Sequence, residues 1–491
     1  MPDPHLSNPP QTLDEARTQI EQLWDVVGQL ESITSDLKAQ NEELVEQVRE
    51  LNERMGKSSR NSSRPPSSDS TSQRANRKKK PKSTKRKGAQ PGHEKHERPL
   101  VPESDVDQIQ RYFPTAACGC GGSIFVDPEP RCRHQVFDIP VVRFSVIEHQ
   151  LFGGQCNGCG KHHCAQTPDS VPSGQMGPNL VALIAHLSGR YHLSIRNIQD
   201  YLVEHWQLHF SLGAISQAQA KATSALGDPY RQIGDFVRQQ PVAHADETRH
   251  FRGNECRWLW SLVCVQACYF LTQASRGKEA ADRLLGEFTG YLVTDDYVGY
   301  NRVPENRRQL CWPHLIRKFI DIAGRVSNGG KIGRRLLLLA HAVIRTRHRW
   351  QDQLIDEAVY YRRMQRLRRS FHQTLERGAR LRIDGRTKRQ CQHLLKRESM
   401  CWTFLKDHRI PLDNNSAERA LRPYVIWRKL SFATQSYQGD QFRPLILSIV
   451  GTAQRIGISS YQFIRIACHQ SMIEGEVKVR FPFDAPRLAT S

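Results

Sequence analysis

At 491 residues the chain is too long for one ordinary hydrophobic core, so we expect two to four domains. A net charge of +21 indicates a polyanionic partner, and nucleic acid is the first candidate. No apolar run reaches the roughly 18 residues of a membrane span, and the first residues do not read as a signal peptide. We therefore expect a cytoplasmic protein whose 13 cysteines serve as metal ligands or buried thiols, with no disulfide framework.

The first segment, residues 13–56, has the heptad pattern of a leucine-zipper coiled coil. Residues 1–56 carry twelve acidic side chains against four basic ones. Leucines recur every seventh residue, at the d positions of the heptad: Leu23, Leu30, Leu37, Leu44 and Leu51. The a positions, three residues before each leucine, are Ile20, Val27, Thr34, Asn41 and Val48. This pattern predicts a parallel homodimer, and the alternative is one long helix folded back on its own chain.

The next segment, residues 57–105, reads as a basic disordered linker. Within residues 57–98, fourteen Lys and Arg residues stand against three acidic ones. Ser, Pro and Lys cannot build a core, so this stretch predicts a flexible arm along DNA phosphate. A linker that only solubilises the chain is the alternative.

A cysteine cluster in residues 110–172 predicts a zinc-ribbon-like domain with one structural Zn²⁺. Two pairs on glycine-rich turns supply the ligands: Cys118 with Cys120, and Cys156 with Cys159. The stretch between them, HQVFDIPVVRFSVIEHQLF, is expected to form a β-hairpin. Buried free thiols are the alternative. The spare ligands are Cys132, His162, His163 and Cys164.

Three short helices are expected in residues 175–238, arranged like a helix-turn-helix. Their third helix carries one lysine and few other base-reading side chains. A helical bridge into the next domain explains the segment at least as well.

An α/β pattern begins at residue 240. In chain order it consists of the strand PVAHADET, the hairpin RWLWSLVCVQACYFLTQA, the helix KEAADRLLGEF, the strand GYLVTDDYVGYN and the strand RRQLCWPH. The first and fourth strands end in carboxylates: Asp246 and Glu247 in the first, and Asp295 and Asp296 in the fourth. The order β-β-β-α-β is that of a ribonuclease-H-like domain, in which these two strands pair and bring their acids together.

A third acid is available at Glu418, within DNNSAERALRP at 413–423. Taken alone, this segment reads as a helix start, because Asn415 and Glu418 have capping-box spacing and Arg422 lies four residues further on. Pro423 is expected to limit or kink that helix. Together with Asp246 and Asp295, however, Glu418 would complete the carboxylate set that two Mg²⁺ ions need for in-line phosphoryl displacement.

These observations predict a multidomain chain. The catalytic domain is expected to comprise residues 240–320 and 406–470, with an Arg-rich helical insertion at 321–405 and a C-terminal tail at 471–491. The insertion's arginines could line a DNA channel, or they could form a solvated helix face.

The blocks VAHADET, LVTDDYVGYN and DNNSAERALRPYVIWRK, with SRGKEA and QLCWPHL among them, carry a family resemblance. Over nearly its whole length the chain resembles the TnpC-type insertion-sequence transposases, family sixty-six. That family combines a leucine zipper, a zinc-binding region and a DDE ribonuclease-H-like domain with a helical insertion. The resemblance implies the acids Asp246, Asp295 and Glu418, and it ranks Asp296 lower because Gly is commoner there in the family.

The resemblance implies a bacterial, nucleoid-associated DNA transposase with two Mg²⁺ ions, or Mn²⁺ in their place. It would cleave strands at transposon ends and join the freed 3′-hydroxyl to target DNA, with accessory transposition proteins as further partners. Ala117 stands where the family's first cysteine is usual, and Arg249 replaces a small residue. A ribonuclease-H-like nuclease and a non-catalytic DNA-binding regulator remain the alternatives.

Overall fold

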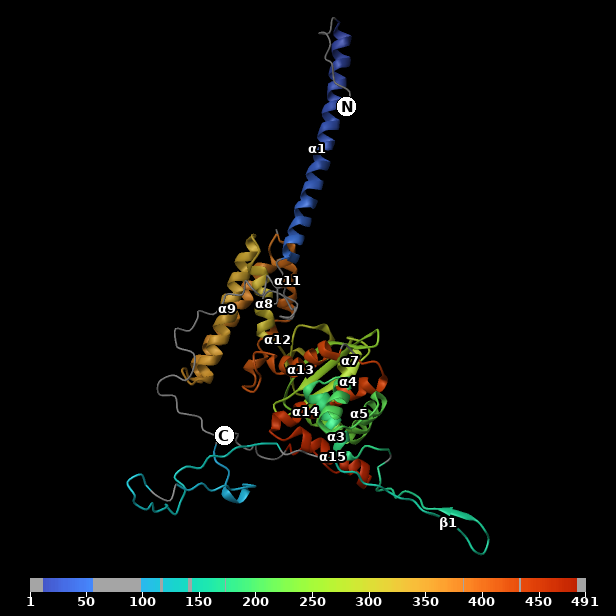
Figure 1. Ribbon diagram of the computed structural model, residues 1–491. Coiled ribbons are helices and arrows are strands. Elements are labelled where there is room, and N and C mark those ends of the chain that lie inside the picture. Colours follow the sequence, from blue (N-terminus) through green and yellow to red (C-terminus); the bar gives the residue numbers. More distant parts are fainter. Residues whose placement is uncertain are drawn as a thin grey trace.

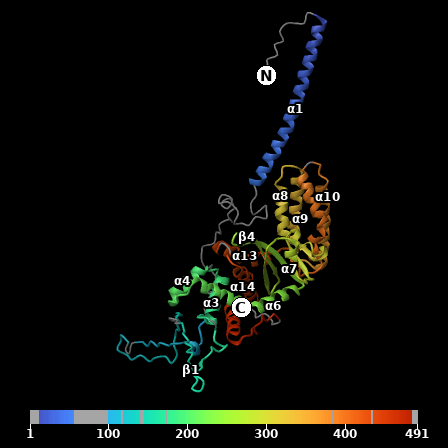
Figure 2. The ribbon, with the colours of Figure 1, turned by 90° about the vertical axis from the view of Figure 1, so that its right-hand side faces the viewer.

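Five strands form one mixed sheet, and helices surround it (Figures 1 and 2). This computed structural model describes residues 12–55, 99–114, 118–139, 144–172, 174–382, 384–431 and 434–483. The predicted basic linker lies largely outside these residues. Within them, no helix combines the length and the apolar character needed to span a bilayer.

The sheet has the strand order β5-β4-β3-β6-β7. Its members are β3 (Val242–Arg252), β4 (Glu255–Val263), β5 (Cys268–Gln273), β6 (Tyr291–Thr294) and β7 (Arg308–Leu310). The first three run antiparallel, whereas β6 pairs in parallel with both β3 and β7. Helix α7 (Lys278–Leu285) connects β5 to β6. This mixed α/β arrangement is consistent with a ribonuclease-H-like domain.

Strand β3 is longer than the sequence predicted. We expected it to end at Asp246–Glu247, but it continues to Arg252 because its pairing with β4 extends to Arg252 and Glu255. The antiparallel partner satisfies the backbone of the polar residues that follow the apolar half. Asp246 therefore lies in the middle of the strand.

Both edges of the sheet are covered, which removes exposed edges open to intermolecular pairing. Along β5, helix α14 (Tyr437–Ile456) supplies two hydroxyls: Ser448 Oγ accepts the Phe270 amide at 2.9 Å and Thr452 Oγ1 accepts the Cys268 amide at 3.2 Å. Along β7, the amide of Phe404 donates to Gln309 Oε1 at 2.8 Å.

Helices before and after the sheet complete one large core. They are α3 (Pro178–Tyr191), α4 (Ile195–Trp206), α5 (Leu212–Ala225), α6 (Gly227–Arg238), α13 (Asn415–Ser431), α14 and α15 (Ser460–His469). Serine side chains cap the first turns of α4 and α5, as Ser194 and Ser211 accept amides three residues ahead. Helix α5 buries its apolar face against α3 and α14, which joins this helical region to the core around the sheet.

The insertion folds around a second core. Its helices are α9 (Asn328–Gln351), α10 (Glu357–Ala379), α11 (Gly385–Lys396) and α12 (Glu398–Cys401). They pack with α8 (Trp312–Ala323), which begins before the predicted insertion, and Figure 2 shows α8, α9 and α10 side by side. At its centre, Trp402 packs edge to face against both Trp312 and Phe371. Val293 of β6 and Leu310 of β7 belong to the same core, so the insertion packs directly against the sheet.

Helix α1 (Leu13–Met55) spans the predicted coiled-coil segment. Its first turn has a capping box, in which Thr12 and Glu15 exchange side-chain-to-amide hydrogen bonds of 3.3 Å. The seam leucines Leu23, Leu30 and Leu37 are exposed, so no other described part of the chain covers them.

The β-hairpin expected between the two cysteine pairs is not formed by the described residues of 134–152. Instead, a short hairpin of β1 (Gly153–Gln155) and β2 (His162–Cys164) surrounds the second pair. Apolar side chains such as Val136 and Ile147 are exposed. Without a third strand or a helix to bury them, alternating apolar residues do not stabilise a two-stranded sheet.

Candidate active site

Two neighbouring parallel strands place Asp246 and Asp295 at the same level of the sheet. The register of β3 with β6 pairs His244 with Val293. Two residues further along each chain lie Asp246 and Asp295, so the two carboxyls emerge from adjacent strands about 4.8 Å apart. Backbone amides orient both: Asp246 Oδ1 accepts the Glu247 amide, and Asp295 Oδ1 accepts the Tyr297 amide, each at 2.9 Å.

Glu418 reaches the same place on the first turn of α13. The start of this helix is fixed to β3 by Asn414, whose side chain is 1% exposed. Asn414 Nδ2 donates to the carbonyl of Ala245 at 2.8 Å, and its Oδ1 lies 3.2 Å from His244 Nδ1. Asn414 therefore attaches the helix to the residues immediately before Asp246.

The capping-box interpretation of Glu418 is wrong. Asn415 is already the first helical residue, and the carbonyl of Asn414 accepts the amides of Ala417 and Glu418. Glu418 Oε1 is buried and has no hydrogen-bond partner. Helix α13 also continues through Pro423 to Ser431, so this proline does not limit it.

Like charges crowd Asp246. Burial first, and then the carboxylates of Glu247, Asp295 and Glu418, raise the pKa of Asp246 well above its usual range. A half-buried carboxyl among other carboxyls is unfavourable unless a cation compensates it. The pKa of Asp246 is thus sensitive to the charges of Asp295 and Glu418, although the three residues are far apart in the sequence.

The adjacent acid Asp296 is occupied by other partners. Its carboxylate binds Lys318 Nζ at 2.6 Å, His393 Nε2 at 2.8 Å and Arg397 Nη1 at 2.8 Å. Burial alone would raise the pKa of Asp296, but Lys318 and His393 outweigh it and hold that pKa below its usual range. Asp296 thus anchors helices of the insertion beside Asp295, and its oxygens are not free for a metal.

Glu247 likewise has partners of its own. Arg276 donates to its Oε1 at 2.9 and 2.5 Å, and Tyr300 donates to its Oε2 at 2.6 Å. The Arg276 guanidinium lies 3.9 Å from the centre of the Tyr297 ring. This buried pair stiffens the segment that follows Asp295.

Cys311 and His314 complete the surroundings of Glu418. Their ligand atoms and a Glu418 carboxylate oxygen all lie within 4.8 Å of one another. Burial raises the pKa of Cys311 to about 12, and its Sγ accepts the Asn414 amide at 3.2 Å. We missed Asn414 and His314 from the sequence, although both lie in the blocks DNNSAERALRP and QLCWPHL.

A comparison with known protein families assigns the chain to one of them. A family model described as "Transposase IS66 family" matches residues 173–441, which is more than half of the chain. The chain belongs to this family. Residues 1–99 match a second model, described as a family of unknown function (DUF6444).

The chain is also similar to two proteins of Sinorhizobium fredii. Uncharacterized protein y4hP is 25% identical over 378 residues, which cover 70% of this chain and 68% of the relative. Uncharacterized protein y4jD is 24% identical over 263 residues, covering 48% of this chain and 51% of that protein. The IS66 family model covers all three candidate acids, which lie between residues 173 and 441.

In this IS66 family chain the two cysteine pairs form turns but do not meet. The amide of Gly121 donates to the Cys118 carbonyl, and that of Gly160 donates to the Cys156 carbonyl, each at 2.9 Å. Backbone hydrogen bonds from Cys120 and Cys159 lower the pKa of the Cys118 and Cys156 thiols. Within the described ranges, these cysteines do not form a group that could share one ion.

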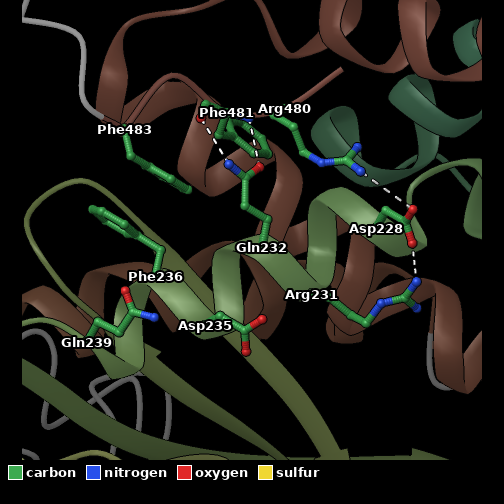
Figure 3. A pocket seen from close by; sticks show the side chains of 9 residues that line it. All are labelled: Asp228, Arg231, Gln232, Asp235, Phe236, Gln239, Arg480, Phe481 and Phe483. Atoms are coloured by element: carbon green, nitrogen blue, oxygen red, sulfur yellow. Dashed lines mark hydrogen bonds and ion pairs between the residues drawn. The ribbon is translucent and has the colours of Figure 1, made fainter. Parts of the chain in front are cut away.

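A cavity of about 630 Å³ lies away from the carboxylates, between α6 and residues 480–483 (Figure 3). Gln232 bonds the backbone of Phe481 through both its amide atoms, at 2.9 and 3.1 Å. Phe236 stacks on Phe483 with ring centres 3.8 Å apart. The predicted C-terminal tail is therefore packed on α6 as far as residue 483.

Proposed function

We propose that this protein is a DDE-type transposase that cleaves DNA at transposon ends and joins them to target DNA. The observation that supports this proposal most is the influence of Asp295 and Glu418 on the pKa of Asp246, since the three acids come from β3, the residue after β6 and the start of α13. Membership of the IS66 transposase family supports it. Such a protein would work at the bacterial nucleoid.

The three carboxyls fit divalent cations. Asp246 is crowded by negative charge, and Glu418 Oε1 is a buried acceptor without a donor. Oxygen ligands of this kind suit Mg²⁺ or Mn²⁺. Bound ions would supply charge stabilisation at the attacking and leaving oxygens of a phosphoryl displacement. The chain's own task is to hold the three acids, while the Asp296 and Glu247 pairs keep the neighbouring acids away from the metal.

The insertion supports a DNA-binding role. Helix α10 presents a row of exposed arginines: Arg362, Arg363, Arg366, Arg368 and Arg369. Arginines spaced along one helix can neutralise successive phosphates of a duplex. Because Asp296 ties α11 to the end of β6, next to Asp295, DNA held by the insertion would be positioned relative to the acids.

The remaining parts of the proposal concern assembly. The exposed leucine seam of α1 supports a homodimer through a parallel coiled coil, which would hold two element ends in one complex. The cysteines Cys118, Cys120, Cys156 and Cys159 are proposed to bind a structural Zn²⁺ once the two turns come together. The domain boundaries given above and the accessory proteins belong to the same proposal.

A strand-transfer assay tests the function. Labelled element-end DNA is incubated with full-length protein and Mg²⁺, using wild type, Glu418→Gln and the control Glu279→Gln. Glu279 lies exposed on α7, so its variant should match wild type. We expect joined products from wild type and Glu279→Gln, and at least about a hundredfold less from Glu418→Gln. Equal products from all three would refute the site, and cleavage without joining would favour a nuclease. DNA binding without metal-dependent cleavage would favour a regulator.

A further inference from the structure

Two buried polar atoms face each other beside the carboxylates. His314 Nδ1 lies 3.7 Å from Glu418 Oε1. Neither atom is accessible to solvent, and neither has a hydrogen-bond partner. Buried polar atoms in proteins nearly always have a partner, so a matched pair of orphans indicates that something binds between them.

We propose that His314 Nδ1 and Glu418 Oε1 together bind one divalent cation, which gives this position a mixed nitrogen and oxygen ligand set. The inference rests on the proposed function, since it adds a ligand to the same carboxylate site. It assigns a role to a residue outside the three acids. It also predicts that Mn²⁺ or Co²⁺ binds here in preference to Mg²⁺.

The separation of the two atoms suits a shared ion. In octahedral coordination with ligands about 2.1 Å from the metal, two adjacent ligand atoms are about 3.0 Å apart and two opposite ones are about 4.2 Å apart. The observed 3.7 Å lies between these two separations, so a small shift of either side chain would let both atoms bind one ion, and it is too long for a hydrogen bond. A direct His–Glu bond therefore does not account for the pair.

The two residues are held in place from behind. His314 lies in the first turn of α8 and Glu418 in the first turn of α13. The amide of Trp312 donates to the carbonyl of Leu412 at 2.8 Å, which ties the two helix starts together. Such support from neighbouring hydrogen bonds is what metal ligands need in order to keep a fixed geometry.

Cys311 is not the third ligand. Its sulfur is buried and already accepts the Asn414 amide at 3.2 Å, so it stabilises the junction between the two helix starts. Mg²⁺ is held almost entirely by oxygen ligands, whereas Mn²⁺, which also favours carboxylates, and still more Co²⁺ accept an imidazole nitrogen more readily than Mg²⁺ does. Removing the imidazole should therefore weaken Mn²⁺ binding by at least about tenfold and affect Mg²⁺ binding less.

Pulsed electron paramagnetic resonance of the full-length protein with Mn²⁺ tests this directly, because it detects a coordinated imidazole nitrogen. We would compare wild type, His314→Asn and the matched control His393→Asn. His393 lies near the site, but it binds Asp296 and does not face Glu418. We expect the nitrogen signal in wild type and His393→Asn, and its loss in His314→Asn. Titration calorimetry on the same samples gives the ratio of Mn²⁺ to Mg²⁺ affinity.

A second variant distinguishes loss of the nitrogen ligand from loss of the fold. His314→Asp replaces the nitrogen by an oxygen ligand, so it should still bind Mn²⁺ but give no nitrogen signal and discriminate less between the two metals. Bound Mn²⁺ without a nitrogen signal in wild type would overturn this inference and leave the proposed function standing. Absence of Mn²⁺ binding, together with absence of strand transfer, would overturn both.

Discussion

The connection between α13 and β3 predicts a specific effect of replacing Asn414. In Asn414→Ala, the side-chain bonds to Ala245 and His244 are lost while the backbone is unchanged. The neighbouring Asn415 offers a matched control, because it is half-buried at the first helical position and lies on the same turn. Comparing the two alanine variants isolates the contribution of the buried amide.

The magnitude follows from the contacts. Each lost hydrogen bond costs about 0.5–1.5 kcal/mol, and leaving a buried partner unsatisfied adds to that, so we expect Asn414→Ala to lower the free energy of unfolding by about 2–4 kcal/mol. Asn415→Ala should stay within about 0.5 kcal/mol of wild type. The first turn of α13 carries Glu418, and misplacing a reacting group by about 1 Å can cost a hundredfold in rate. Cleavage by Asn414→Ala should therefore fall by about that factor.

Urea unfolding with linear extrapolation measures the stability change. Cleavage of labelled DNA is then measured under conditions in which both variants are fully folded. The rate then depends on the placement of Glu418 and not on the fraction of folded protein. Equal stability and equal rates for the two variants would refute the argument that Asn414 attaches the helix to the sheet. A stability loss with an unchanged rate would show that Glu418 is held by other contacts.

Four further results are expected. Burial lowers the pKa of His244 to about 4, so the unfolded chain binds a proton that the folded chain does not between about pH 6.5 and pH 4. Stability should fall as pH falls through this window, and urea titrations of His244→Gln should show a smaller fall. Asp296→Asn removes three ion pairs and should speed hydrogen exchange in α11, whereas unchanged exchange would argue against the anchor. Leu30→Glu should convert a dimer into a monomer in analytical ultracentrifugation, and a monomeric wild type would contradict the coiled coil. Cys156→Ser should lower the zinc content measured by atomic absorption to near zero, and an unchanged content would exclude that ligand.

The sheet could be predicted from the sequence because its strands are short apolar runs, and two of these runs are followed directly by acidic residues. The pairing of β3 with β6 follows from the strand order, and it brings Asp246 and Asp295 to one level. The choice of Asp295 over Asp296 came from family resemblance alone. The structure adds a physical reason for it, because Asp296 is bound by Lys318 and two side chains of the insertion.

Other features could not be predicted because their causes lie far away in the chain. Asn414 contacts residues about 170 positions earlier, and no local pattern reveals such a partner. Glu418 matched a capping box locally, yet the helix starts at Asn415 and Glu418 Oε1 has no hydrogen-bond partner. The hairpin expected in 134–152 failed for a related reason: alternation shows which side chains would share a face, but not whether anything packs against that face.

The position of Glu418 late in the chain has a consequence for truncated translation products. A translation product that stops before residue 414 would contain Asp246 and Asp295 but lack both Asn414 and Glu418. On the proposals above, it would keep the dimerisation helix and the basic arm, pair with full-length subunits and occupy element ends without cutting them. On the same proposals, such truncated subunits would lower the transposition frequency, because they would occupy DNA without completing the acid set.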